Sequence, residues 1–180
     1  LPIFTKSELA WFKQGQPFPR ALDLCYNSYN RSRVFFIIMS YYFAFSALFN
    51  AITSAILGWV VFYKNPNNKV NKAFAFFCFC VVSWSIPYIF WPLVKTKEST
   101  LLSFQLLHIG AIFASCAYWQ FFAHGLDGQQ KVKNIIIMGY IAALMIVSFV
   151  FTPLFISDMV PNYSMKHWAV PGPVYYFYLL

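Results

Sequence analysis

The chain has 180 residues, of which 60% are hydrophobic, 22% are aromatic and only 10% are charged. Soluble domains average about 45–50% apolar and about 25% charged residues, so 13 Lys and Arg with 5 Asp and Glu are too few to cover a soluble exterior. The net charge of +8 does not indicate nucleic-acid binding, because the cations lie at the margins of long apolar blocks, where they set topology and contact lipid headgroups. The composition therefore predicts a membrane protein. Its expected partner is the lipid bilayer, and nucleic acid is not expected to bind.

The two ends of the sequence predict a fragment of a longer protein. The chain begins at Leu1 rather than at a methionine, and it stops within the apolar run Val174–Leu180. Residues 1–33 are polar and irregular, and they lack the continuous apolar core of a cleavable signal peptide. We treat 1–33 as a polar leader outside the domain proper, with a short surface helix possible around Ser7–Lys13, and 34–180 as a partial transmembrane domain.

Four apolar blocks are long enough to cross the ~30 Å hydrocarbon core of a bilayer as helices, and a fifth begins at the end of the sequence. The expected spans are about 34–63, 73–94, 101–123, 135–151 and the truncated 174–180. Short stretches rich in Lys, Asn, Pro or Gly separate the first four spans, and Pro153–Pro173 is expected to form a longer connection. The sequence thus predicts an all-α, multi-pass transmembrane helix bundle.

Two of these spans carry features that bear on helix packing. In the first span, Ser46, Asn50 and Ser54 recur every four residues beside small alanines, a stripe suited to the close approach of another helix. In the second span, Pro87 and Pro92 each remove a backbone donor and are expected to kink the helix. Such kinks are plausible places for a conformational change.

Loop lysines predict the orientation, since cytoplasmic loops carry the excess of Lys and Arg. The first and third loops contain five lysines, which are Lys64, Lys69, Lys72, Lys131 and Lys133. The second and fourth loops contain three, which are Lys95, Lys97 and Lys166. This count places the first loop on the cytoplasmic side of the membrane and the N-terminus outside, although Arg31 and Arg33 in the leader favour the reverse.

The sequence shows no pattern of catalytic residues, no metal-ligand spacing and no cofactor motif, and the spans contain no Asp or Glu. The candidate ligand-binding residues are Trp84, Gln105, His108, Ser115 and Trp119. The last four fall within a sector of about 80° on one helix, taking about 100° per residue. The same groups would equally serve to hold helices together, which is the commoner use of such side chains. Tyr163, His167 and Trp168 form either a lid over such a pocket or interfacial anchors.

The order of several short motifs resembles a known family. The motifs are the Lys64–Lys72 turn followed by Ala73-Phe74-Ala75-Phe76 and Trp84, the run Leu101–Gly110, Phe121-Phe122-Ala123-His124, Thr152-Pro153-Leu154-Phe155 and Pro171-Gly172-Pro173-Val174-Tyr175. Over about residues 45–180 the chain resembles the N-terminal seven-transmembrane sensor region found ahead of bacterial histidine kinases and sometimes diguanylate cyclases. It departs from that family in its 33-residue leader.

The resemblance implies a sensory input module that is not itself catalytic. The family implies an extracellular start, a homodimer, an unidentified small ligand or membrane stimulus, and a cytoplasmic output domain in the same chain, most often a histidine kinase. Two alternatives stay open. A small-solute transporter or channel subunit would place ionisable groups at membrane depth, and a membrane-embedded lipid-modifying enzyme would use His108 as its base.

Overall fold

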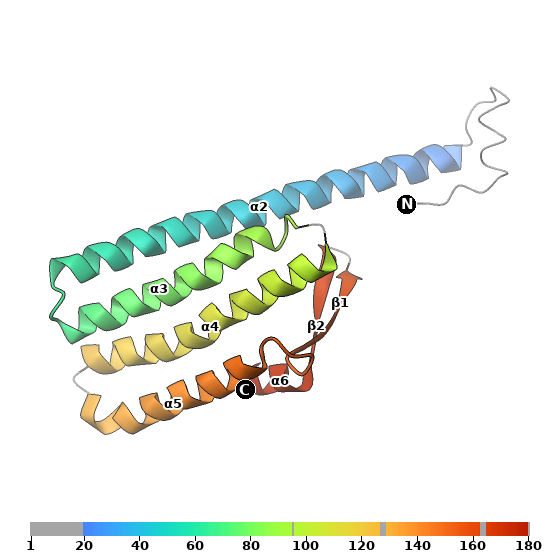
Figure 1. The fold of residues 1–180 in the computed structure, drawn as a ribbon. Helices are drawn as coiled ribbons and strands as arrows, with labels where there is room; N and C mark the ends of the chain where they lie inside the picture. Colours follow the sequence, from blue (N-terminus) through green and yellow to red (C-terminus); the bar gives the residue numbers. More distant parts are fainter. Residues whose placement is uncertain (1–19, 95, 127–128, 163–164, 180) are drawn as a thin grey trace. The chain divides into compact units, whose positions relative to one another are not determined.

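The computed structural model describes residues 20–94, 96–126, 129–162 and 165–179. The chain divides into two compact units, Leu1–Ile38 and Met39–Leu180. The described elements, in chain order, are α2 (Arg20–Lys64), α3 (Lys69–Phe90), α4 (Lys97–Gly125), α5 (Gln129–Phe149), β1 (Ile156–Asn162), β2 (Met165–Pro171) and α6 (Pro173–Leu179) (Figure 1).

Within these described ranges, four helical segments are long and apolar enough to cross a membrane. They are Ile37–Lys64, Lys69–Phe90, Lys97–Gly125 and Val132–Phe149. Their outward faces carry many exposed large apolar side chains, such as Phe79, which is 65% exposed, and Met138, which is 69% exposed. So large an apolar surface is unfavourable in water and favourable against lipid tails. The structure confirms the predicted all-α, multi-pass bundle.

Helix α2 begins nearer to the N-terminus than the predicted first span, which started at about residue 34. The helix begins at Arg20, so the interpretation of the leader as irregular is wrong for residues 20–33. The physical reason is that no proline or glycine occurs between Arg20 and Leu57. Proline and glycine are the residues that most disfavour a helix, whereas polar residues lower its stability only slightly. The surface helix expected at Ser7–Lys13 lies outside the described residues.

Helix α3 is displaced by four residues from the predicted span. Its start is fixed by Asn68, whose Oδ1 accepts a hydrogen bond of 2.8 Å from the Val70 N–H. The helix ends at Phe90, so Pro87 lies inside it and Pro92 lies beyond it. In the turn that follows, the N–H groups of Leu93 and Val94 both donate to the Phe90 carbonyl, at 2.9 and 3.0 Å. The predicted kink of the helix at Pro92 is therefore wrong.

The small-residue stripe of the first span packs against α3. Asn50 Nδ2 donates a 2.9 Å hydrogen bond to the Oγ of Ser85, which is buried on α3. Ser46 bonds within its own helix, to the Phe43 carbonyl at 2.9 Å. The alanines of the stripe are buried, and they are Ala44, Ala47 and Ala51. Small side chains with one interhelical hydrogen bond are typical of close helix packing in membranes.

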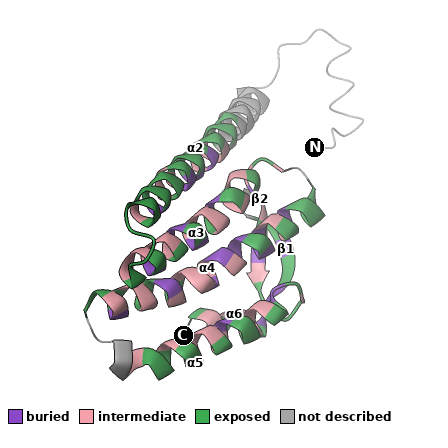
Figure 2. Cartoon of the chain, turned by 60° about the vertical axis from the view of Figure 1, so that its left-hand side comes forward, coloured by how far each residue is buried: buried purple, intermediate pink, exposed green. Residues whose placement is uncertain are grey.

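Helices α3 and α4 approach each other backbone to backbone at Gly110. A Cβ atom added at Gly110 would lie 2.5 Å from the Trp84 nitrogen and 2.9 Å from the Cys80 carbonyl oxygen. Glycine is therefore required at this crossing by the space available. Helix α4 is also the most enclosed of the spans (Figure 2). In its apolar stretch of 18 residues 44% of the stretch is buried, whereas in that of α5 only 6% is buried.

A β-hairpin lies within the segment Pro153–Pro173, for which the sequence predicted a longer connection and no strands. Strands β1 and β2 pair antiparallel, with register irregularities at Ile156–Asp158 and Val160–Asn162. The hairpin buries Met159 and Ala169 in the same core as the helices. Strand β1 was not predicted from the sequence because Pro161 lies within it and the irregular register breaks the alternation of apolar and polar residues.

Candidate functional site

His108 lies on α4 with only 4% of its surface exposed. Its Nδ1 is 2.7 Å from the carbonyl oxygen of Phe104, one turn earlier in the helix. A carbonyl only accepts hydrogen bonds, so Nδ1 carries the hydrogen, and Nε2 of the neutral ring keeps its lone pair. His108 is thus a fixed imidazole with one hydrogen-bond acceptor left in an apolar part of the bundle.

Four aromatic rings surround this imidazole, and we call them with His108 the His108 cluster. The distances from the His108 ring centroid are 4.8 Å to Phe104, 5.2 Å to Phe155, 5.4 Å to Tyr175 and 5.8 Å to Tyr178. The last three rings stand edge to face with the imidazole, which is the favourable geometry for aromatic pairs. The cluster joins α4 to α6 and to the residue that precedes the hairpin.

A second ring contact fastens the hairpin itself. Trp91, just after α3, is 5% exposed, and its ring centroid lies 5.1 Å from that of Phe104 and 5.6 Å from that of Trp168 on β2. The outer connection therefore packs on the helices through Trp168, and whether it acts as a lid or as an interfacial anchor stays a prediction. Trp168 itself remains 41% exposed, and Tyr163 lies outside the described residues.

The turn Pro171-Gly172-Pro173 positions Tyr175 and Tyr178 next to His108. Gly172 alone separates the end of β2 from the start of α6. Its N–H donates to the Phe155 carbonyl at 2.8 Å, and the Val174 N–H donates to the Leu154 carbonyl at 3.0 Å. Tyr175 and Tyr178 then stand three residues apart on α6, a spacing that places both on one face of a helix.

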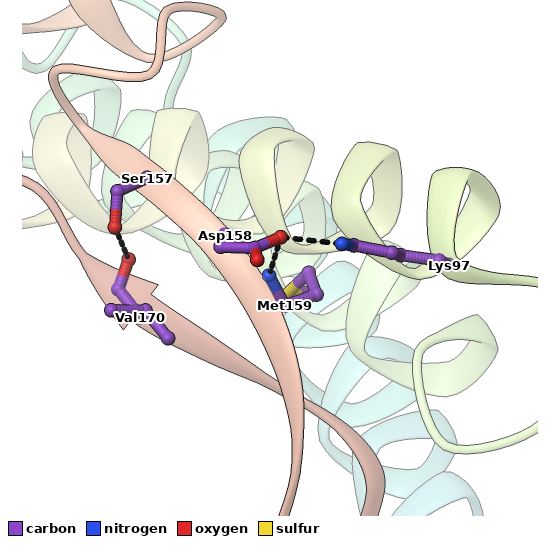
Figure 3. Close-up of polar contacts among 5 residues, drawn as sticks. All are labelled: Lys97, Ser157, Asp158, Met159 and Val170. Carbon is purple, nitrogen blue, oxygen red and sulfur yellow. Dashed lines mark hydrogen bonds and ion pairs between the residues drawn. The ribbon is translucent and has the colours of Figure 1, made fainter.

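One ion pair ties the hairpin to the beginning of α4. Lys97 Nζ lies 2.5 Å from Asp158 Oδ1, which also accepts a 2.7 Å hydrogen bond from the Met159 N–H (Figure 3). The Ser157 hydroxyl donates to the Val170 carbonyl across the hairpin at 3.1 Å. The hydrogen bond from Lys97 and that from the Met159 N–H hold the pKa of Asp158 below its ordinary value.

We expect the Asp158→Asn variant to have a melting temperature that is lower by about 2 °C or less at neutral pH, because both members of the pair are about half-exposed. The folded-state pKa lies below the ordinary value of 3.8, so the carboxylate stabilises the fold above that pH and loses its contribution as the pH falls through the folded pKa. Thermal unfolding measured from about pH 7 to about pH 2 checks this. A difference between wild type and variant that persists in acid contradicts it.

The five candidate residues do not come together in one place. Gln105 and His108 are 8% and 4% exposed, whereas Trp119 is 70% exposed and Ser115 is exposed with a 3.5 Å hydrogen bond within its own helix. Trp84 is 37% exposed and contacts Tyr88. A shared sector is not a shared site, since Gln105 and Trp119 are about 21 Å apart along the helix axis at ~1.5 Å per residue. Their role in ligand binding stays a prediction.

Several residues of the His108 cluster were not named as candidate site residues from the sequence. Phe155, Tyr175 and Tyr178 lie outside the predicted complete spans, where no periodic pattern was long enough to orient them. The spacing of the two tyrosines directly after Pro173 was the available signal, since proline favours the first position of a helix. Only the fold shows that this short helix faces His108.

The His108 cluster can hold a neutral imidazole in place and present its remaining lone pair to a hydrogen-bond donor. Over the described ranges no group of three or more His, Cys, Asp and Glu side chains is placed to hold a metal ion. Comparisons of the chain with protein-family models, with curated proteins and with solved structures find no significant match.

Proposed function

We propose that this chain is the membrane-embedded input module of a signal-transduction protein. It passes a stimulus from its outer end or from the bilayer to a cytoplasmic output domain in the same polypeptide, of the histidine-kinase class, and it is not itself catalytic. The observation that supports this most is the His108 cluster, in which one buried imidazole contacts α4, α6 and the residue preceding the hairpin.

The connections of the hairpin suggest how a signal would travel. With only Gly172 between β2 and α6, and with the backbone bonds to Leu154 and Phe155, a displaced hairpin has to displace the start of α6. The α3–α4 pair offers less freedom, because its backbones touch at Gly110. A stimulus acts by favouring one of two positions of the hairpin and α6 against this fixed pair, through its different affinity for the two.

The lysines support an orientation with the hairpin outside. Lys64, Lys69 and Lys72 surround the α2–α3 turn, and the last residues of α4 and the first of α5 lie at that same end of the second unit (Figure 1). The opposite end holds the hairpin and the ion pair of Lys97 with Asp158. An excess of cations marks the cytoplasmic side. As in the family that the chain resembles, we propose a homodimer in the bacterial cell membrane with its N-terminus outside.

We expect the native full-length protein in lipid nanodiscs to autophosphorylate with radiolabelled ATP. We expect His108→Ala to change the rate of this reaction by at least about fivefold, which is the lower end of typical couplings between two sites. His124→Ala is the matched control. His124 lies on the same helix and makes the same bond to a carbonyl one turn earlier, at 2.8 Å to Gln120, but it stands at the other end of α4.

Two results would overturn the proposal. The first is a native polypeptide that carries neither a phosphoacceptor-histidine domain nor a nucleotide-cyclase domain. The second is an output that His108→Ala and His124→Ala leave equally unchanged. Uptake of small solutes by proteoliposomes containing the protein, abolished by His108→Ala, would favour the transporter instead.

A further inference from the structure

The turn between α2 and α3 presents three ammonium groups at one end of two membrane-spanning helices. Lys64 is the last residue of α2, Lys69 is the first residue of α3, and Lys72 lies one turn further along. All three side chains are exposed. We call Lys64, Lys69 and Lys72, with the turn that joins them, the lysine turn.

Side-chain hydrogen bonds fix the backbone of the lysine turn. Asn71 Nδ2 donates to the Val61 carbonyl at 3.0 Å and to the Asn65 carbonyl at 3.3 Å, so α3 is fastened to the end of α2. The Asn68 side chain caps α3. The three lysines are therefore attached to an ordered frame, and a ligand does not have to order the backbone before it binds.

Two aromatic side chains place this end at the level of lipid headgroups. Trp59 and Tyr63 stack on each other one turn apart on α2, with ring centroids 6.5 Å apart and planes at 13°. They are 70% and 77% exposed. Exposed Trp and Tyr next to Lys at the end of an apolar helix are typical of the membrane–water interface. Lysine side chains directly beyond such an aromatic pair are long enough to extend toward lipid phosphates.

Among the described residues of the second unit, the carboxylates are those of Glu98 and Asp158, and both lie at the other end, by the start of α4 and in β1. Exposed Lys133 on α5 adds to the positive charge of the lysine turn. Of the five acidic residues in the chain, Asp127 is the one that the sequence assigns to this end, and its placement lies outside the described residues. At headgroup depth the anions available to cations are lipid phosphates, and acidic phospholipids bear a net negative charge that zwitterionic lipids do not.

We propose that the lysine turn is a binding site for the headgroups of acidic phospholipids, with the Trp59–Tyr63 pair against the adjoining acyl chains. The site does not depend on the sensory function proposed above, since it lies at the other end of the bundle from His108. Its consequence is a protein that prefers acidic lipids over zwitterionic ones in its immediate lipid shell.

Quenching of tryptophan fluorescence by brominated lipids tests this in the whole chain. We expect brominated phosphatidylglycerol to bind at least about fivefold more strongly than brominated phosphatidylcholine, and high salt to weaken this preference. The triple variant Lys64→Gln, Lys69→Gln, Lys72→Gln loses the preference. The matched variant with arginine at the same three positions keeps it, because the charge is retained. Trp59→Phe removes the part of the quenching that is specific to the acidic lipid.

Circular dichroism and thermal unfolding in a neutral detergent identify any variant that fails to fold, and single Lys→Gln variants then replace the triple one. Equal quenching by the two lipids in the wild type overturns the proposal. So does a folded glutamine variant that keeps the preference. Inorganic phosphate that abolishes the preference, where sodium chloride at the same ionic strength does not, also overturns it, because the site would then take free phosphate and not lipid.

Discussion

Replacing Gly110 by alanine is expected to destabilise the bundle by about 2–3 kcal/mol, the usual cost of forcing extra atoms into a packed interior. The added methyl group would meet the Trp84 nitrogen at 2.5 Å and two further backbone atoms at 2.9 Å. Backbone atoms cannot move away one at a time as a flexible side chain can, so α3 and α4 have to separate. Thermal unfolding in detergent should show a melting temperature lower by about 4–12 °C.

Gly139 provides the matched control for this prediction. It lies inside α5, and a Cβ added there would meet the Cys116 sulfur at 3.7 Å, an ordinary contact. Alanine is preferred to glycine in a helix by about 1 kcal/mol, so Gly139→Ala should leave the melting temperature unchanged or raise it slightly. Equal effects of the two substitutions would show that α3 and α4 are not in backbone contact.

Gly172→Ala is expected to loosen the hairpin and α6 together. A Cβ at Gly172 would collide with the carbonyl oxygen of Leu154 and lie 2.7 Å from that of Pro153. Relief of this collision requires breaking the hydrogen bonds that tie the turn to Phe155 and Leu154. We expect the amide hydrogens of 156–171 to exchange at least about tenfold faster, which corresponds to about 1.4 kcal/mol of lost protection.

Hydrogen-exchange mass spectrometry measures this directly for peptides from the hairpin. Gly125→Ala is the control, because a Cβ added at Gly125 meets nothing within 4 Å. Slow exchange that persists in the hairpin of Gly172→Ala would mean that the turn is not held against Leu154. Faster exchange confined to the hairpin, with α3 unchanged, would separate this effect from that of Gly110→Ala.

The helices themselves follow from local features of the sequence. An apolar run has to form a helix in a bilayer, because no water is present to satisfy its backbone groups. The ends of the helices were less certain, since they depend on capping. Asn68 and Thr96 begin α3 and α4 by accepting hydrogen bonds from Val70 and Ser99, several residues before the apolar runs that the sequence analysis used.

The hairpin and the His108 cluster depend on contacts between distant residues. Met159 is buried in β1 and Phe155 lies against His108, although nothing in their neighbouring sequence sets them apart from loop residues. The same holds for the candidate site. His108 was recognised as polar within an apolar span, but which of its helix neighbours it shares a site with depends on where α6 and the hairpin cover α4.

The sequence by itself determined a multi-pass helical membrane protein, because burial of an apolar segment in lipid is a property of that segment alone. It also determined the small-residue stripe of α2, since spacing along one helix is local. Only the tertiary structure decided that His108 meets Tyr175 and Tyr178, that Gly110 touches the backbone of α3, and that Ser115 and Trp119 stay exposed. The physical reason is that packing between elements depends on which faces meet and at what height, and neither is encoded in the periodicity of a single helix.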